Sequence, residues 1–131
     1  MLSHLRLFIF PLALLLAACG GMPHKKVDTV GEYGNAVRWS EWDQAWNFTD
    51  PATRKSATLP ESELDRLKAV KISGYEVRSK EPQADGTLDQ TVEIRYVEQA
   101  TQVEKSIRDH QVWRTDDEGE HWWLTTGLPE F

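Results

Sequence analysis

Few residues of this chain could carry out chemistry, and its single cysteine, Cys19, is the first of them. A lone cysteine forms no internal disulfide and has no partner for a metal site of the Cys-x-x-Cys kind. Before it come a positive charge at Arg6, an almost wholly apolar run over residues 7–18, and the small residues Ala17 and Ala18. This order of segments is typical of a secretory signal peptide.

The apolar run is shorter than the roughly 20 residues that a helix needs to cross a bilayer core, and Pro11 interrupts it. The residues Leu16-Ala17-Ala18-Cys19 resemble the lipobox of bacterial lipoproteins. The resemblance implies that residues 1–18 are removed and that the Cys19 sulfur receives a diacylglycerol. Gly20, in place of an aspartate, implies sorting to the outer membrane with the domain facing the periplasm. An ordinary secretory signal with an incidental cysteine is the alternative.

The charge of the chain argues against a nucleic-acid partner. The sequence has 15 Lys and Arg against 21 Asp and Glu, and loss of Arg6 with the signal peptide leaves 14 against 21, a net charge of about −7. Nucleic-acid binding needs clustered cations, and an acidic body also adheres poorly to an anionic membrane. We therefore expect the lipid to hold the protein at the membrane, a tether over residues 19–28, and one domain over residues 29–131.

Asp109 is the one candidate catalytic residue of the domain. A carboxylate desolvated on an inward sheet face could act as a general base, whereas an acid paired with a neighbouring arginine or facing water would be structural. We expect the structural acid, with a pKa near the ordinary value of about 3.9. The histidines His24, His110 and His121 lack the surroundings of a catalytic set, and residues 116–121 lack the spacing of a calcium loop. We expect no metal site, no cofactor and no enzymatic activity.

Tryptophan is the most frequent aromatic residue of the chain. The six tryptophans are Trp39, Trp42, Trp46, Trp113, Trp122 and Trp123. On a helical period the first three share one stripe, which favours core packing over a binding platform. Trp122 and Trp123 are neighbours on a strand and must point in opposite directions, so one of them is a candidate exposed anchor. With Asp109 and Trp113 they form the candidate pocket or docking residues.

Helical signals occupy the first part of the domain. Thr29 and Glu32 have the spacing of a capping box, which predicts one helix from about Val30 to the Asp50-Pro51 pair. A second such signature over residues 58–61 predicts a short helix that turns Leu64 and Leu67 inward.

The period then changes from 3.6 to 2, which predicts four strands. They cover residues 69–79, 88–98, 102–114 and 121–127, with turns at 84–87 and 116–120. The inward parity shifts at Gly74, from Val70 and Ile72 to Tyr75 and Val77, which predicts a β-bulge there.

A hairpin that turns at Ala100 and Thr101 sets the register of the two central strands. It places Ile94 opposite Ile107, and Glu93 opposite Arg108 on the other face. An apolar pair and an opposite-charge pair in one register support this pairing. The same register places Asp109 opposite Val92 on the inward face.

These elements predict an α+β fold in which an amino-terminal Trp-rich helix and a short second helix pack on a four-stranded antiparallel meander. The arrangement resembles the cone of the NTF2-like superfamily, with the cystatin-like folds as neighbours. Over residues 31–131, with the ending "WWLTTGLPEF", the chain is similar to small uncharacterised lipoproteins of Gram-negative bacteria. The resemblance implies a lipid-anchored binding or assembly module with a possible envelope protein partner. A small-ligand carrier or an enzyme that uses Asp109 in the cone is the alternative.

The lipid anchor makes the first testable prediction. Cys19→Ser should abolish acylation and leave a soluble or unprocessed precursor, because no other segment is suited to hold the body at a membrane. Mass spectrometry of the mature amino terminus measures this. An unmodified Cys19 in the wild-type protein, or cleavage at another site, would refute the lipoprotein interpretation.

Overall fold

The computed structural model describes residues 28–116, 119 and 121–131. The elements in these residues are α1 (Thr29–Arg38), α2 (Trp42–Asn47), α3 (Glu61–Lys68), β1 (Val70–Pro82), β2 (Leu88–Glu98), β3 (Val103–Thr115) and β4 (Trp122–Leu124). The strands form one antiparallel sheet in the order β1-β2-β3-β4, which confirms the predicted α+β class and the meander. The predicted signal peptide, Cys19 and nearly all of the predicted tether lie outside the described residues.

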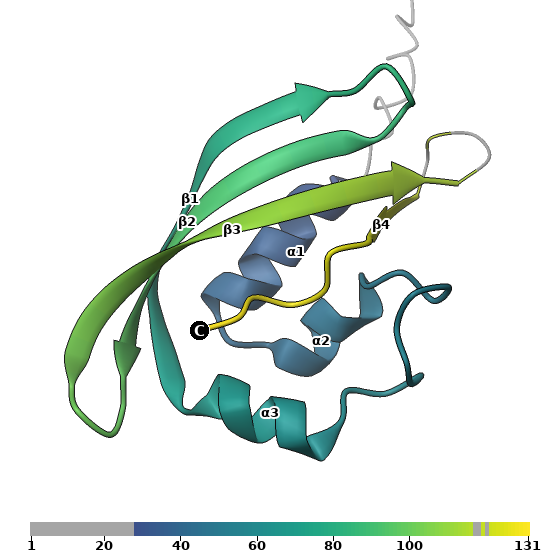
Figure 1. The fold of residues 1–131 in the computed structure, drawn as a ribbon. Helices are drawn as coiled ribbons and strands as arrows, with labels where there is room; N and C mark the ends of the chain where they lie inside the picture. The colour runs from purple at the N-terminus through teal and green to yellow at the C-terminus, as the bar shows by residue number, and fades with distance from the viewer. Residues whose placement is uncertain (1–27, 117–118, 120) are drawn as a thin grey trace, which may run out of the picture.

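The sheet is long and curved, and the three helices lie on its concave side (Figure 1). α1 is the helix closest to the sheet in this view, and the C-terminal segment runs from β4 back toward the helices. One core lies between these layers. Its members with no exposed surface include Tyr33, Leu67, Ile94, Trp113 and Leu124.

The register of the central hairpin is confirmed. Ile94 pairs with Ile107, Glu93 with Arg108 and Val92 with Asp109. The ion pair of Glu93, however, is made with Arg78 of β1, at 2.8 Å. The apolar alternation therefore sets the register. Glu93 and Arg108 lie opposite each other on the two strands but form no salt bridge.

The bulge at Gly74 is also confirmed, because the β1–β2 register shifts between Ile72 and Gly74. A side chain at Gly74 would come within 2.6 Å of the Arg95 guanidinium, the far end of an exposed and flexible side chain that would have to shift to admit it. Val77 lies on the predicted face opposite Val92 but is 48% exposed. β1 is an edge strand, and the groove between its outer half and α1 leaves Val77 uncovered.

The single Trp-rich helix is a wrong prediction, because the chain forms two helices there. Asp28 caps α1, accepting a hydrogen bond from the Gly31 N–H at 3.0 Å, so the capping residue is Asp28 and not Thr29. At the other end Ser40 takes a left-handed conformation, with φ of 57°.

Two backbone hydrogen bonds explain why the helix ends at this point. The Ser40 N–H donates to the Val37 carbonyl at 3.0 Å, and the Glu41 N–H donates to the Ala36 carbonyl at 2.8 Å. This pair of bonds is the Schellman ending of a helix, here with serine in place of the usual glycine. The break removes Trp39 from the stripe: Trp39 is 69% exposed, whereas Trp42 is 3% exposed.

Smaller boundary differences have local causes. α3 begins after Pro60 with no side-chain cap, so Thr58 does not cap it, but Leu67 is buried and Leu64 half-buried as expected. β4 is only three residues long, and after it the Thr125 N–H still donates to the Val112 carbonyl at 2.8 Å. The predicted turn over residues 116–120 falls partly on residues 117, 118 and 120, which lie outside the described residues.

The broken helix yields a stability prediction with an internal control. Trp42→Ala should lower the free energy of unfolding by about 3–5 kcal/mol, because it removes a buried aromatic side chain. Trp39→Ala, three residues away, should cost less than about 1 kcal/mol, since that indole is exposed and stacks only on Arg38. Urea unfolding of both variants measures this, and similar losses in the two would contradict the assigned burial.

Candidate functional site

The inner face of β3 presents Asp109, Gln111 and Trp113 in alternation, and these residues form the centre of the candidate site. Gln111 and Trp113 have no exposed surface, and Asp109 is half-buried. Since alternate residues of a strand share one face, the sheet itself brings these three side chains together.

The Gln111 carboxamide joins three strands. Its oxygen accepts hydrogen bonds from Gln90 Nε2 and from Trp113 Nε1, each at 3.1 Å. Its nitrogen donates to the Tyr75 hydroxyl at 3.0 Å and to Asp109 Oδ2 at 2.9 Å. A carboxamide has two acceptor lone pairs and two donor hydrogens, so Gln111 makes every hydrogen bond available to it. We call these five residues the Gln111 cluster.

Tyr33 of α1 covers the cluster from the helix side. Its ring meets the Trp113 ring edge-on at 5.2 Å, and it has no exposed surface. Burial raises the pKa of Tyr33 well above its ordinary value, and the nearby Asp109 and Tyr75 act in the same direction. Burial likewise raises the pKa of Tyr75 to about 12. Both phenols are therefore neutral at physiological pH. The Tyr33 hydroxyl is buried without a hydrogen-bond partner among the described residues.

Asp109 lies in a different environment from the one we expected. Desolvation raises its pKa above the ordinary range, and the Glu130 charge adds to this, while the Gln111 hydrogen bond and His110 partly oppose it. Arg108 points to the other face of the sheet because it is the neighbouring residue on the strand. Arg108 is therefore not the partner of Asp109, whose hydrogen-bond partner is the neutral Gln111 amide, and burial shifts the Asp109 pKa upward from the ordinary value we expected. The structural role of this acid stays a prediction.

The space beside Asp109 is a surface groove of about 500 Å³, which reaches Thr126, Leu128 and Glu130. Behind it, Tyr33 and the Gln111 cluster occupy the interior of the fold. A base at this position could reach a molecule in the groove. It could not reach one enclosed between helix and sheet, because side chains fill that volume.

The structure places one of the predicted docking tryptophans in the core and leaves the other two half-buried. Trp113 belongs to the core, so its assignment as a docking residue is wrong. Trp122 and Trp123 are both half-buried: Trp122 packs against the core, and the Trp123 ring lies 4.1 Å from the His121 ring. Neither is the exposed anchor we expected. The exposed indole is Trp39, which sequence reasoning missed because no glycine or proline indicates the helix end.

An ion pair between a buried carboxylate and a partly exposed guanidinium was not predicted at all. Arg114 of β3 binds Asp50 through two hydrogen bonds, Nε to Oδ2 at 2.5 Å and Nη2 to Oδ1 at 2.6 Å, and the Asp50 side chain is only 3% exposed. The Arg114 hydrogen bonds are the main cause of the lowered pKa of Asp50. Asp50 Oδ1 also accepts from the Ala52 N–H at 2.9 Å, so the same carboxylate caps the turn that begins at Pro51. The pair attaches the segment after α2 to the sheet.

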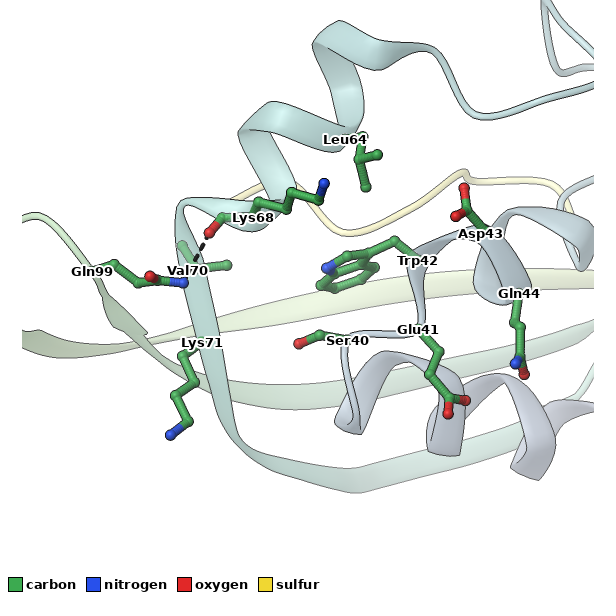
Figure 2. A pocket seen from close by; sticks show the side chains of 10 residues that line it. All are labelled: Ser40, Glu41, Trp42, Asp43, Gln44, Leu64, Lys68, Val70, Lys71 and Gln99. Carbon is green, nitrogen blue, oxygen red and sulfur yellow. Dashed lines mark hydrogen bonds between the residues drawn. The ribbon is translucent and has the colours of Figure 1, made fainter.

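A second groove lies between α2, α3 and the start of β1 (Figure 2). It measures about 440 Å³, with the Trp42 indole at its centre and Leu64 and Val70 beside it. Around them stand side chains of both signs, among them Lys68 and Asp43. The mixed charges converge on no common point, so this groove shows no arrangement for a charged ligand.

The comparisons with known protein families, characterised proteins and solved structures find no match to this chain. The likeness to the NTF2-like superfamily and to bacterial lipoproteins accordingly stays a prediction from the sequence. Across residues 28–116, 119 and 121–131, no group of His, Cys, Asp and Glu side chains is arranged to hold a metal ion. In the same part of the chain, no helix has the length and apolar character that a membrane span requires.

The contributions of Asp109 and Asp50 to stability should depend on pH with opposite signs. The folded state raises the pKa of Asp109, so ionising it costs stability above that pKa, and the cost disappears below the unfolded value of about 3.9. Asp109→Asn should therefore be neutral or stabilising at pH 7, and this difference should vanish as the pH falls.

Asp50 is the matched control for this measurement. Its folded pKa is lowered, so its carboxylate stabilises the fold above the unfolded pKa, and that stability is lost as the pH falls through the folded pKa. Asp50→Asn should therefore destabilise at pH 7, and the difference should shrink in acid. Urea unfolding between pH 7 and 3 compares the variants. A loss of stability at pH 7 in Asp109→Asn like that in Asp50→Asn would contradict the assigned environment of Asp109.

Proposed function

We propose that this protein is a lipid-anchored, non-catalytic binding or assembly module on the periplasmic face of the outer membrane. The observation that carries the non-catalytic part of the proposal is the filled interior. Tyr33, Gln111 and Trp113 have no exposed surface, and the hydrogen-bonding groups of Gln111 are all used within the domain. Such an interior stabilises a fold and offers no enclosed space to a substrate.

The anchor is supported by the sequence around Cys19 and by where the domain begins. α1 starts at Thr29, so only nine residues separate its first residue from Cys19. A chain of this length spans at most about 30–35 Å when fully extended. A lipid on Cys19 would therefore hold the domain close to the membrane surface, within reach of other proteins of the envelope.

Trp39 supports recognition of a protein partner. It is 69% exposed, and the Arg38 guanidinium lies 4.9 Å from its ring centre. Tryptophan and arginine are enriched among the residues that dominate binding energy in protein interfaces. The net negative charge supports a protein partner over a nucleic acid.

Crosslinking in intact envelopes tests the proposal. The lipidated wild-type chain should crosslink to an envelope protein other than itself, identified by mass spectrometry, and Trp39→Ala should lose most of that product. Val77→Ala, which shortens an exposed side chain on another surface, should retain it. Absence of any such product with the wild-type chain, or equal yields from both variants, would argue against a binding module that uses Trp39.

A small-ligand carrier or enzyme at Asp109 is the second candidate. The raised pKa of Asp109 and the groove of about 500 Å³ beside it favour this function. Ligand-dependent shifts of the Thr126 and Leu128 signals in NMR spectra, lost in Asp109→Asn while the fold remains intact, would select it over the binding module.

A further inference from the structure

β3 extends well beyond its neighbour on one side. β4 pairs only with residues 113–115 of β3. After β4 one more backbone hydrogen bond is made to this edge, from the Thr125 N–H to the Val112 carbonyl at 2.8 Å. Before Val112, residues 103–111 pair with β2 on one edge only. Within the part of the chain that the structure describes, no backbone hydrogen bond is made on their other edge.

The residues that face this open edge follow from strand geometry. Because the Val112 backbone points to the β4 side, the backbones of His110, Arg108, Ser106 and Glu104 point to the same side. Their N–H and C=O groups can therefore pair with one more antiparallel strand. The side chains of Lys105, Ile107 and Asp109 lie on the concave face, and those of the alternate residues lie on the convex face.

The two outer edges of the sheet differ in regularity. The register of β1 shifts twice, after Ile72 and after Val77, and the strand ends at Pro82. Bulges and proline are two of the devices by which proteins prevent the addition of strands at an edge, and charged side chains are a third. β3 has neither a bulge nor a proline, because its register with β2 runs without a shift from Trp113 to Val103. Its open edge does carry charged side chains, Lys105 and Asp109 among them, so it admits a strand whose charges are complementary.

We propose that two copies of this chain pair through the open edges of β3, antiparallel, about a two-fold axis at Ile107. In this register Ile107 faces Ile107 of the second copy, and Lys105 of each copy faces Asp109 of the other. On the convex face Glu104 of each copy lies opposite His110 of the other. The surface is thus complementary to itself, with an apolar centre and flanking pairs of opposite charge, as a two-fold interface requires.

Neighbouring registers lack this match. A two-fold axis at Ser106 would place the charged Lys105 opposite the apolar Ile107 of the second copy. An axis at Arg108 would place two arginines, Arg108 of each copy, opposite each other. The Ile107 register also explains the unusual position of Asp109, a half-buried acid with a raised pKa and no cation paired with it in the described chain. Lys105 of the second copy would supply the missing positive charge. Its present partner is Glu98, at 2.6 Å, in an exposed pair of the kind worth little in stability.

The surroundings of the edge leave room for the second strand. The groove of about 500 Å³ runs beside Ile107, Arg108, Asp109 and His110, and its far wall is the C-terminal segment. The inward side chains of an added strand would enter this groove. A membrane that holds both copies would favour the pairing by raising their effective concentration, but the pairing does not depend on the anchor.

Cysteine crosslinking tests the axis. In the full chain with Cys19→Ser, Ile107→Cys should give a disulfide-linked dimer on mild oxidation, because residues opposite each other on the axis bring their Cα atoms to about 4.5–5.5 Å. Val103→Cys, on the same strand and 48% exposed, is the control. Its two copies would lie more than 20 Å apart, at about 3.3 Å per residue, so it should remain monomeric. Equal crosslinking of both variants would overturn the proposed register.

Charge exchange tests the pairing without cysteine. Sedimentation of the Cys19→Ser chain should show a dimer. Its dissociation constant should rise about tenfold or more in Lys105→Asp, because this substitution places an aspartate opposite Asp109 of the other copy at both ends of the interface. The double variant Lys105→Asp/Asp109→Lys should restore the dimer, because it exchanges the two signs across the axis. A monomeric Cys19→Ser chain at high concentration, or a double variant no better than the single one, would overturn the proposal.

Discussion

A buried carboxamide needs four hydrogen-bond partners, and in this protein the carboxamide of Gln111 finds them on three strands. Tyr75 comes from β1, Gln90 from β2, and Asp109 and Trp113 from β3. Leaving one of these groups unpaired in the core would cost about 1–3 kcal/mol. The four hydrogen bonds of Gln111 therefore constrain the rest of the fold. The observed strand register, the curvature that brings Tyr75 over β3, and the placement of α1 above Trp113 must all be compatible with these bonds.

The Gln111 cluster also determines whether the domain has room for a ligand in its interior. A curved sheet with a helix in its concavity can enclose a ligand when the inward side chains are small. Here those side chains are large, and their polar atoms bind one another, so the space between helix and sheet is filled by the domain itself. The surface offers an exposed indole at Trp39, the groove beside Asp109 and the open edge of β3. All three lie where another molecule can reach them, and they carry the proposals made for this protein.

The ion pair of Asp50 and Arg114 joins the segment after α2 to β3. A buried carboxylate without a counter-charge would strongly destabilise the protein, and the bidentate guanidinium removes this penalty. The pair lies where the Asp50 N–H also donates to the Leu124 carbonyl at 2.8 Å, so the segment after α2 joins the sheet beside β4.

The sequence by itself determined the sheet. Period-two alternation, the parity change at Gly74 and the hairpin at Ala100 and Thr101 are local signals, and a one-residue slip would turn the whole apolar set outward. The sequence also supports the Cys19 lipobox, because that motif is read as a linear segment. It placed Asp109 on the inward face, since that follows from the register alone.

Only the tertiary structure decided the rest. The helix break at Ser40 depends on a serine adopting φ of 57°, which intrinsic preferences disfavour and the packing of α1 and α2 compensates. The partners of Asp109 and Asp50 come from positions close in space, and residue types alone do not show which amide or guanidinium will reach them. Whether an indole is core or surface was likewise decided by packing, because Trp39 and Trp42 share one sequence pattern and differ only in what covers them.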